Sequence, residues 1–223
     1  GAIGVLGAKK LDRLVAFAVI GSMGMVMVAI SLFTPVSIAA ALYYMVHSTL
    51  AGAVLFLIVD LVRSDRGNVQ LIPAPPVAGA ALTAALFFVG AIAMAGLPPL
   101  SGFIGKLLIL NASFDNGAAV WVWAVVLIAS LVSIVGFSRA GSIVFWKAQS
   151  VARPEDEALP DRPATLSYVA VGGLVALLIA HTVFAGHVHR YTTAISAQLF
   201  APDAYFSTVL DTPGKMSTPK EGY

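Results

Sequence analysis

Long apolar segments separated by short polar ones run through the chain, and each has the length of a membrane-spanning helix. A spanning helix needs roughly 20 predominantly apolar residues. By this criterion the pattern predicts spans at residues 14–33, 37–62, 79–112, 119–145 and 166–185. We therefore expect an all-α integral membrane protein with about five transmembrane helices.

The third apolar segment is too long for one ordinary helix, and "LPPLSG" at 97–102 interrupts it. Its 34 residues would extend about 51 Å as a helix, whereas the hydrocarbon core is roughly 30 Å thick. Pro98 and Pro99 lack amide hydrogens, and their rings clash with the preceding helical turn. We expect one discontinuous span of two half-helices. The alternative is two spans joined by a hairpin at the prolines, which would reverse the topology downstream.

The distribution of Lys and Arg favours the discontinuous span. With one discontinuous span, nine basic residues fall on one side of the membrane and three on the other. Cytoplasmic loops carry the Lys/Arg excess, so the C-terminus is expected on the outer, periplasmic side. Residues 1–186 would form the transmembrane domain and 187–223 an outer tail, in which 191–210 has the composition of an interfacial amphipathic helix. The nine are Lys9, Lys10, Arg13, Arg63, Arg66, Arg139, Lys147, Arg153 and Arg162, and the three are Arg190, Lys215 and Lys220.

Composition agrees with this fold class and excludes several functions. The chain is 59% hydrophobic and 11% charged, whereas soluble domains have about 25% charged residues. It contains no cysteine, which excludes disulfides, thiolate metal sites and cysteine nucleophiles. No basic stripe for nucleic acid, no nucleophile–base pair and no metal-ligand cluster stands out, so we expect neither enzyme activity nor a cofactor. The sequence begins without methionine at the end of an apolar helix, and we expect it to be the C-terminal part of a longer protein.

Two ionisable residues inside apolar segments are the main candidates for chemistry. Lys106 lies about two turns after the prolines, where a charge costs about 2.5–3.5 kcal/mol. Non-helical backbone at membrane depth lines a cavity or is buried in protein, so a lysine beside it can exchange protons. His47, near the centre of its span, is a natural proton relay. The alternatives are a lysine whose amine extends to the interface and a neutral histidine hydrogen-bonded in the bundle.

Other residues are weaker candidates. Gly102 and Gly105 flank the break together with the prolines, and a polar track could include Ser48, Ser101, Arg139 and His181. For Arg139 a position at a helix end is the alternative, and for His181 an ordinary buried histidine. Asp12 is expected in a solvated loop cluster, and Asp60 is expected to pair with Arg63 one turn later.

Three segments resemble a known family, in the family's order. They are "LGAKKLDRLVAFAVIGSMG" (6–24), "ALYYMVHSTLAGAVLFLIVDLV" (41–62) and "LPPLSGFIGKLLIL" (97–110). They are similar to motifs of the antiporter-like subunits that respiratory complex I shares with the multisubunit cation/proton antiporters of the Mrp or Pha type. Within that superfamily, "YYMVHSTLAGAVLFL" and "SRAGSIVFWK" (138–147) resemble the branch of the D-type antiporter subunits.

The resemblance implies that this sequence is the second of two inverted repeats, with terminal helices, in a larger proton-translocating subunit. It implies that Lys106 and His47 belong to a central proton path, and that H⁺ is exchanged for Na⁺ or K⁺ across a bacterial inner membrane. The implied partners are antiporter subunits of the A, B, C, E, F and G types within the lipid bilayer. Asp12 stands where the family has a lysine, so that lysine's role does not carry over. The alternatives are a proton-pumping subunit of complex I or of a membrane-bound hydrogenase, and a membrane scaffold whose polar residues only stabilise packing.

Overall fold

The computed structural model describes residues 1–77, 79–115, 117–152 and 165–210. The regular secondary structure in this part of the chain is helical, apart from one isolated antiparallel bridge between Lys10 and Gln70. The helices are α1 (Ala2–Gly7), α2 (Leu11–Ser31), α3 (Pro35–Arg66), α4 (Ala80–Ala95), α5 (Ser101–Ala112), α6 (Ala119–Gly141), α7 (Thr165–Val183), α8 (Ala185–Leu199) and α9 (Asp203–Leu210), and α6 continues into a π-helical turn (Ser142–Trp146) and a 3₁₀ turn (Lys147–Ser150).

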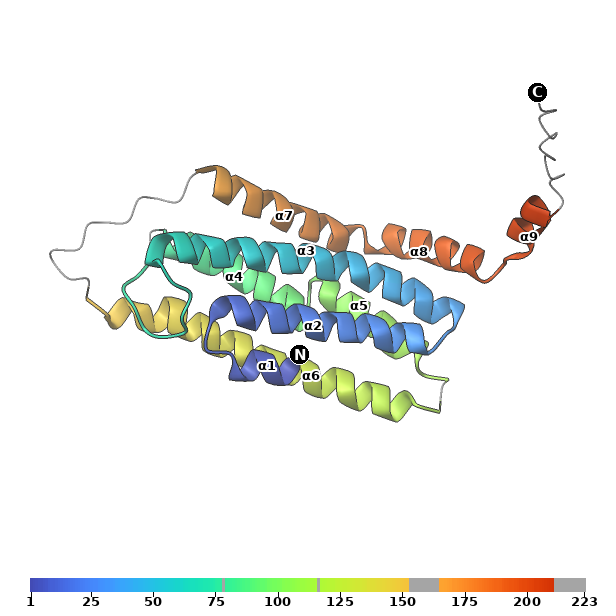
Figure 1. The fold of residues 1–223 in the computed structure, drawn as a ribbon, viewed down its shortest axis with the longest axis horizontal. Helices are drawn as coiled ribbons and strands as arrows, with labels where there is room; N and C mark the ends of the chain where they lie inside the picture. The colour runs from blue at the N-terminus through green and yellow to red at the C-terminus, as the bar shows by residue number, and fades with distance from the viewer. Residues whose placement is uncertain (78, 116, 153–164, 211–223) are drawn as a thin grey trace, which may run out of the picture.

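The predicted all-α membrane fold is confirmed. Four segments are long and apolar enough to cross a membrane, namely α2, α3, the continuous run Ala119–Ser150 and α7, and the two shorter apolar helices are α4 and α5. The long helices lie side by side along the longest axis of the molecule (Figure 1). The third predicted span, 79–112, corresponds to the pair α4 and α5.

The central helix is α3, which packs against α2, α4, α5, α7 and α8. Its small side chains let neighbouring helices approach closely, and Ala39, Ala40 and Ala51 are buried. The helix begins with a capping box, because the Thr34 hydroxyl accepts from the Ser37 amide at 3.1 Å while the Ser37 hydroxyl accepts from the Thr34 amide at 3.0 Å. Apart from α6, which packs on α1, α2, α4 and α5, the helices that carry the candidate site therefore pack directly on α3.

The helices α4 and α5 follow one another in the same direction along the bundle (Figure 1). This arrangement matches one discontinuous span rather than the hairpin alternative. The break is slightly shorter than 97–102, because α4 ends at Ala95 and Ser101 and Gly102 already form the first turn of α5. Gly96 terminates α4 with a left-handed φ of 76°, which glycine adopts without steric cost. The prolines occupy the connection, where no helical amide is needed.

The predicted last span, 166–185, corresponds to α7, and Phe184 separates it from α8. The segment expected to be a tail from residue 187 onward begins inside α8, which packs along α3. The Ser196 hydroxyl on α8 donates to the Pro35 carbonyl at 2.6 Å, which fixes α8 to the start of α3. The predictions that concern Arg153, Arg162 and the basic residues of the C-terminal tail, Lys215 and Lys220, lie outside the described residues.

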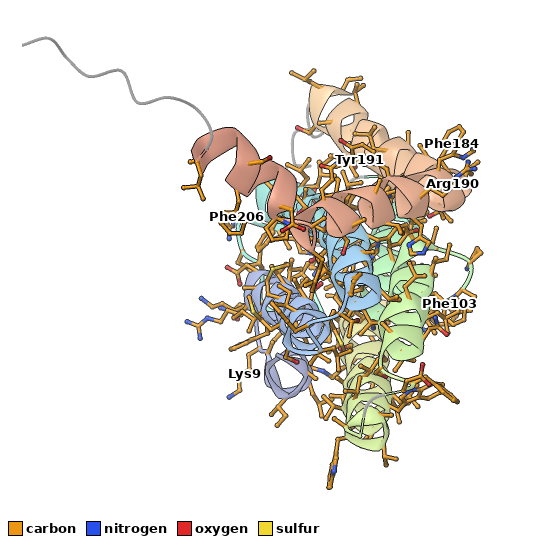
Figure 2. All side chains as sticks on the ribbon, turned by 90° about the vertical axis from the view of Figure 1, so that its right-hand side faces the viewer. Lys9, Phe103, Phe184, Arg190, Tyr191 and Phe206 are labelled. Atoms are coloured by element: carbon orange, nitrogen blue, oxygen red, sulfur yellow. The ribbon has the colours of Figure 1, made fainter. Side chains whose placement is uncertain are left out.

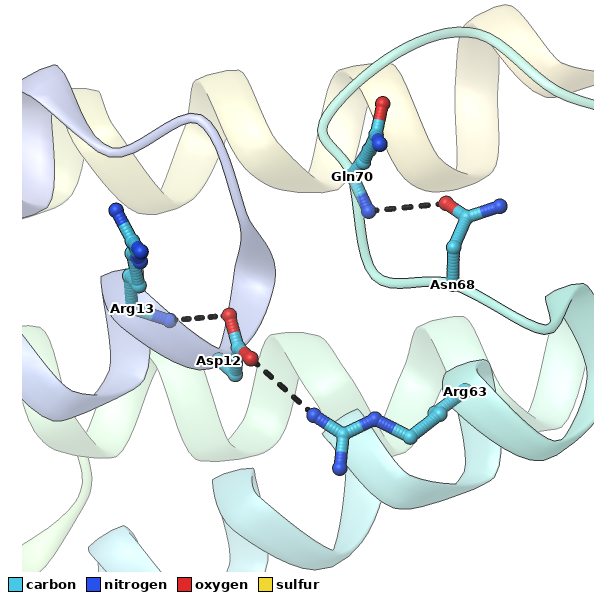
Figure 3. A network of polar contacts seen from close by, with 5 residues as sticks. All are labelled: Asp12, Arg13, Arg63, Asn68 and Gln70. Atoms are coloured by element: carbon cyan, nitrogen blue, oxygen red, sulfur yellow. Dashed lines mark hydrogen bonds and ion pairs between the residues drawn. The ribbon is translucent and has the colours of Figure 1, made fainter.

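At the opposite end of the bundle, the α1–α2 connection pairs with the loop after α3. The Leu11 amide donates to the Val69 carbonyl at 2.8 Å, and the Leu71 amide donates to the Lys9 carbonyl at 2.9 Å. Asp12 and Arg63 form an ion pair of 3.2 Å between α2 and α3 (Figure 3). The predicted Asp60–Arg63 pair is therefore replaced by a bridge between helices, and Asp12 belongs to the first turn of α2 rather than to a loop.

Candidate functional site

Lys106 lies on α5 with its amine inside the bundle. The side chain is 7% exposed, and Nζ donates to the Ala95 carbonyl at 2.6 Å and to the Ser130 hydroxyl at 2.8 Å. Ala95 is the last residue of α4, where backbone carbonyls have no intrahelical partner and the helix dipole is negative. The break in the span thus creates an acceptor for the amine, and the amine does not extend to the molecular surface.

Ser130 supplies the second acceptor from α6. Its hydroxyl donates to the Val126 carbonyl one turn earlier at 2.7 Å, so its oxygen is free to accept from Lys106. Both partners of the amine are neutral oxygens, and among the described residues Lys106 forms no salt bridge. An ammonium without a counter-ion in such a place is costly, which favours a group that exchanges protons.

Glycine at the break makes room for the lysine. A Cβ built on Gly96 would lie 2.6 Å from Cδ and 2.7 Å from Nζ of Lys106. The lysine side chain therefore passes directly over Gly96 to reach the end of α4. Any larger residue at position 96 would push it away from the Ala95 carbonyl.

His47 lies fully buried on α3, beside the start of α5. Its Nδ1 is 2.9 Å from the Ser101 hydroxyl, and its ring packs near that of Tyr44 with centroids 5.5 Å apart. Gly102 allows this approach, since a Cβ there would lie 2.7 Å from Nε2 of His47 and would collide with the Ala93 carbonyl.

A small cavity adjoins Lys106 between α2, α3 and α6. It is lined by Lys106 together with Ser22, Tyr44 and Ser133, among apolar side chains, and offers about 40 Å³ to the centre of a water molecule. A single water needs roughly 10–15 Å³ on this measure, so the cavity is large enough to hold water. The Ser22 hydroxyl is 2.6 Å from that of Ser48 and 3.4 Å from that of Tyr44. Polar groups therefore continue from Lys106 to the residue next to His47.

The structure gathers most of the residues singled out in the sequence. Lys106 lines the cavity, Ser48 contacts the cavity residue Ser22, and His47 pairs with Ser101. His181 on α7 stacks on Tyr43, which lies one turn before His47 on α3. Arg139 lies elsewhere, where its Nη2 donates to the Ala8 carbonyl at 2.6 Å.

Sequence reasoning did not single out the partners of these residues. Ser22 and Ser130, like Ser31 and Ser133, are expected from the sequence only to form hydrogen bonds between helices or to hold water, and nothing in the sequence distinguishes them. Thr182, whose Oγ1 accepts from the Ser101 amide at 2.9 Å, carried no signal except its position next to His181.

Comparison with known proteins places the chain in a family. A profile of the transmembrane family "NADH:quinone oxidoreductase/Mrp antiporter" matches residues 1–133. The D subunit of the probable K⁺/H⁺ antiporter of Rhizobium meliloti is 29% identical, and the match covers 96% of this chain and 44% of that protein. The D subunit of the Na⁺/H⁺ antiporter of Bacillus subtilis is 28% identical, and the match covers 94% of this chain and 42% of that protein. The N subunit of the NADH-quinone oxidoreductase of Granulibacter bethesdensis is 30% identical, and the match covers 78% of this chain and 36% of that protein. This chain thus spans less than half the length of these relatives.

Solved structures share the fold. A chain of the Mrp complex from Dietzia sp. DQ12-45-1b superposes with a TM-score of 0.81 at 21% identity, over 94% of this chain and 46% of that one. A chain of respiratory complex I from Thermus thermophilus superposes with a TM-score of 0.71 at 24% identity, and the match covers 88% of this chain and 41% of that one. The resemblance inferred from the sequence motifs is confirmed, and the chain belongs to the NADH:quinone oxidoreductase/Mrp antiporter transmembrane family.

Proposed function

We propose that this chain is the proton-conducting part of the D-type subunit in a multisubunit monovalent cation/proton antiporter, which exchanges H⁺ for Na⁺ or K⁺. The observation that carries the proposal is the buried Lys106 amine, which is held by two neutral oxygens at a helix break and adjoins a polar cavity. The names of the D-type relatives support the type of transport. The protein acts as a transporter subunit and not as an enzyme.

In this proposal Lys106 binds and releases the proton. As an ammonium it donates to the Ala95 carbonyl and the Ser130 hydroxyl. When it gives a proton to the cavity, the neutral amine keeps hydrogens for these same acceptors, so the side chain need not leave its place. A site that holds both protonation states in one geometry exchanges protons with little reorganisation.

His47 is the next proton carrier in the proposal. The hydroxyls of Ser22, Ser48 and Tyr44 connect the cavity to the α3 face where His47 lies. A hydroxyl accepts one proton while it donates another, and an imidazole does the same with its two nitrogens. The Ser101 hydroxyl at Nδ1 fixes the ring orientation. The proton thus moves between helices, along the membrane plane.

The proposed orientation follows from the basic residues. Lys9, Lys10, Arg13, Arg63 and Lys147 lie at or near the bundle end that holds the α1–α2 connection and the end of α6 (Figure 1). We place this end in the cytoplasm of a bacterial cell and the α8 end on the outer side of the inner membrane. Residues 1–186 then form the transmembrane domain, and the partners are the other subunits of the antiporter.

A second candidate is a proton-pumping subunit of a complex I-type respiratory enzyme, which the relationship to the N subunit of NADH-quinone oxidoreductase favours. The same lysine and histidine would serve that function. Neighbouring genes for small multi-span antiporter subunits would support the antiporter, and genes for quinone-binding and iron–sulfur subunits would support the pump.

The proposed function is tested with Lys106→Ala in the full-length subunit within its assembled complex. Inverted membrane vesicles are energised, Na⁺ or K⁺ is added, and the loss of the pH gradient is followed with a fluorescent dye. The matched control is Lys147→Ala, since Lys147 is exposed at a helix end. We expect loss of antiport in the first variant and normal antiport in the second. Normal antiport in an assembled Lys106→Ala complex would leave Lys106 as a packing residue and support the scaffold alternative.

A further inference from the structure

A second helix interruption lies beside the break between α4 and α5. The helices α7 and α8 follow one another along the bundle (Figure 1), separated only by Phe184. The amide of Ser101, the first residue of α5, donates to the hydroxyl oxygen of Thr182 at the end of α7 at 2.9 Å. An amide in the first turn of a helix has no intrahelical acceptor, and here α7 supplies one. The two interruptions are therefore in direct contact.

His181 is the ionisable residue at this contact. It precedes Thr182, its side chain is 7% exposed, and its ring stacks on that of Tyr43 with centroids 4.5 Å apart. Tyr43 and His47 are four residues apart on α3, so they share one face of that helix. His181 thus adjoins the surroundings of His47 from α7.

Several buried polar atoms in this region lack an aligned hydrogen bond within the described part of the chain. They are Nε2 of His181, Nε2 of His47 and the hydroxyl of Tyr43. Buried polar groups are nearly always paired, and exceptions gather where groups exchange protons or bind water. The mechanism proposed above uses neither His181 nor Tyr43.

We propose that His181 is a further proton-relay residue, which connects His47 to the junction of α7 and α8. This inference rests on the proposed function. In the step, protonated His47 loses one proton and neutral His181 gains one, through a water molecule between them. The water accepts one proton and passes on another, so it ends unchanged. Tyr43 orients the His181 ring by stacking and remains neutral.

The α7–α8 junction gives this relay a direction. Tyr43 on α3 is the ionisable group that stacks on His181, and His47 lies one turn later on the same face of α3. Beyond the junction α8 continues toward the C-terminal end of the bundle, where Arg190 is exposed. Figure 2 views the molecule from this end and shows Phe184, Arg190 and Tyr191 on α8 and at its start. The relay therefore leads from the centre of the bundle toward the end that we place on the outer side.

The test uses His181→Phe in the full-length subunit within its complex, because phenylalanine keeps the stacking on Tyr43 and removes the proton-binding nitrogens. The matched control is His187→Phe on α8, whose histidine is exposed and contacts only Phe184 among the described rings. Antiport is measured in H₂O and in D₂O. We expect His181→Phe to slow antiport about 100-fold or more, the usual scale for losing a proton-transfer group, and to increase the slowing caused by D₂O. The control is expected to keep the normal rate and the normal D₂O ratio.

The outcomes separate the two proposals. If Lys106→Ala abolishes antiport and His181→Phe is normal, His181 is no relay and the proposed function stands. If Lys106→Ala is also normal, the proposed function itself fails. A slower His181→Phe with an unchanged D₂O ratio shows a packing role and overturns the relay. His181→Gln serves where His181→Phe does not assemble, and failure of both to assemble likewise makes His181 a packing residue.

Discussion

Gly102→Ala is expected to destabilise the bundle and to slow antiport, because the added methyl group has no room. Its Cβ would collide with the Ala93 carbonyl of α4 and lie 2.7 Å from Nε2 of His47. The carbonyl belongs to a helix and cannot rotate away, so α5 must move relative to α4 or His47 must leave the Ser101 hydroxyl. Overpacking of this kind costs about 1–3 kcal/mol.

The matched control is Gly24→Ala in α2. A Cβ at Gly24 meets no described atom within 4 Å, and alanine favours a helix over glycine by about 0.5–1 kcal/mol. The same chemical change is therefore expected to act with opposite signs at the two positions. The difference in unfolding free energy between the variants is about 1.5–4 kcal/mol.

Thermal unfolding of the purified complex, together with antiport in vesicles, tests this prediction. A difference of that size corresponds to at least about 3 °C in melting temperature for a unit of this length. Antiport should fall only in Gly102→Ala, since only that change displaces His47. Equal melting temperatures and equal antiport in the two variants would refute the close packing of α5 against α4 and His47.

Three further substitutions test other parts of the structure. Ser130→Ala removes one of the two acceptors of Lys106, and a hydrogen bond to a charged group is worth about 1.5–3 kcal/mol. Antiport should therefore be slower than normal but faster than in Lys106→Ala. A normal rate would contradict a role for Ser130. Thr34→Ala removes the capping box of α3 and should cost about 0.5–2 kcal/mol in thermal unfolding, whereas an unchanged melting temperature would show that the cap contributes little. Asp12→Asn breaks the partly exposed pair with Arg63 and should cost less than about 1 kcal/mol, so a large fall in melting temperature would show a greater structural role.

The spans and the discontinuous helix were predictable because they depend on properties read along the chain. The length of an apolar run fixes whether a helix can cross a membrane, and Pro98 and Pro99 prevent a continuous helix. The exact end of the break was not predictable to the residue. Ser101 and Gly102 form part of α5 because a helix can begin directly after a proline-containing turn.

Contacts between helices were not predictable in the same way. Asp60 and Arg63 are neighbours on one helix face, yet Arg63 pairs with Asp12 from α2, which the sequence places 51 positions away. The polar composition of α8 suggested a free or interfacial segment, but Ser196 and its neighbours pack against α3. Such outcomes depend on which faces meet in three dimensions, and the pattern of one chain segment does not contain that information.

The helix break leaves two backbone polar groups without partners in their own helices, and the candidate site supplies those partners. Interrupting α4 leaves the Ala95 carbonyl without an intrahelical donor, and starting α5 leaves the Ser101 amide without an acceptor. Lys106 satisfies the first group and Thr182 the second. The proposed proton carrier is therefore also a structural cap, so a loss of antiport in Lys106→Ala has two causes that must be separated. Lys106→Arg keeps a donor for Ala95 but holds its proton permanently, so an assembled, thermally normal and inactive Lys106→Arg complex would assign the loss to proton exchange.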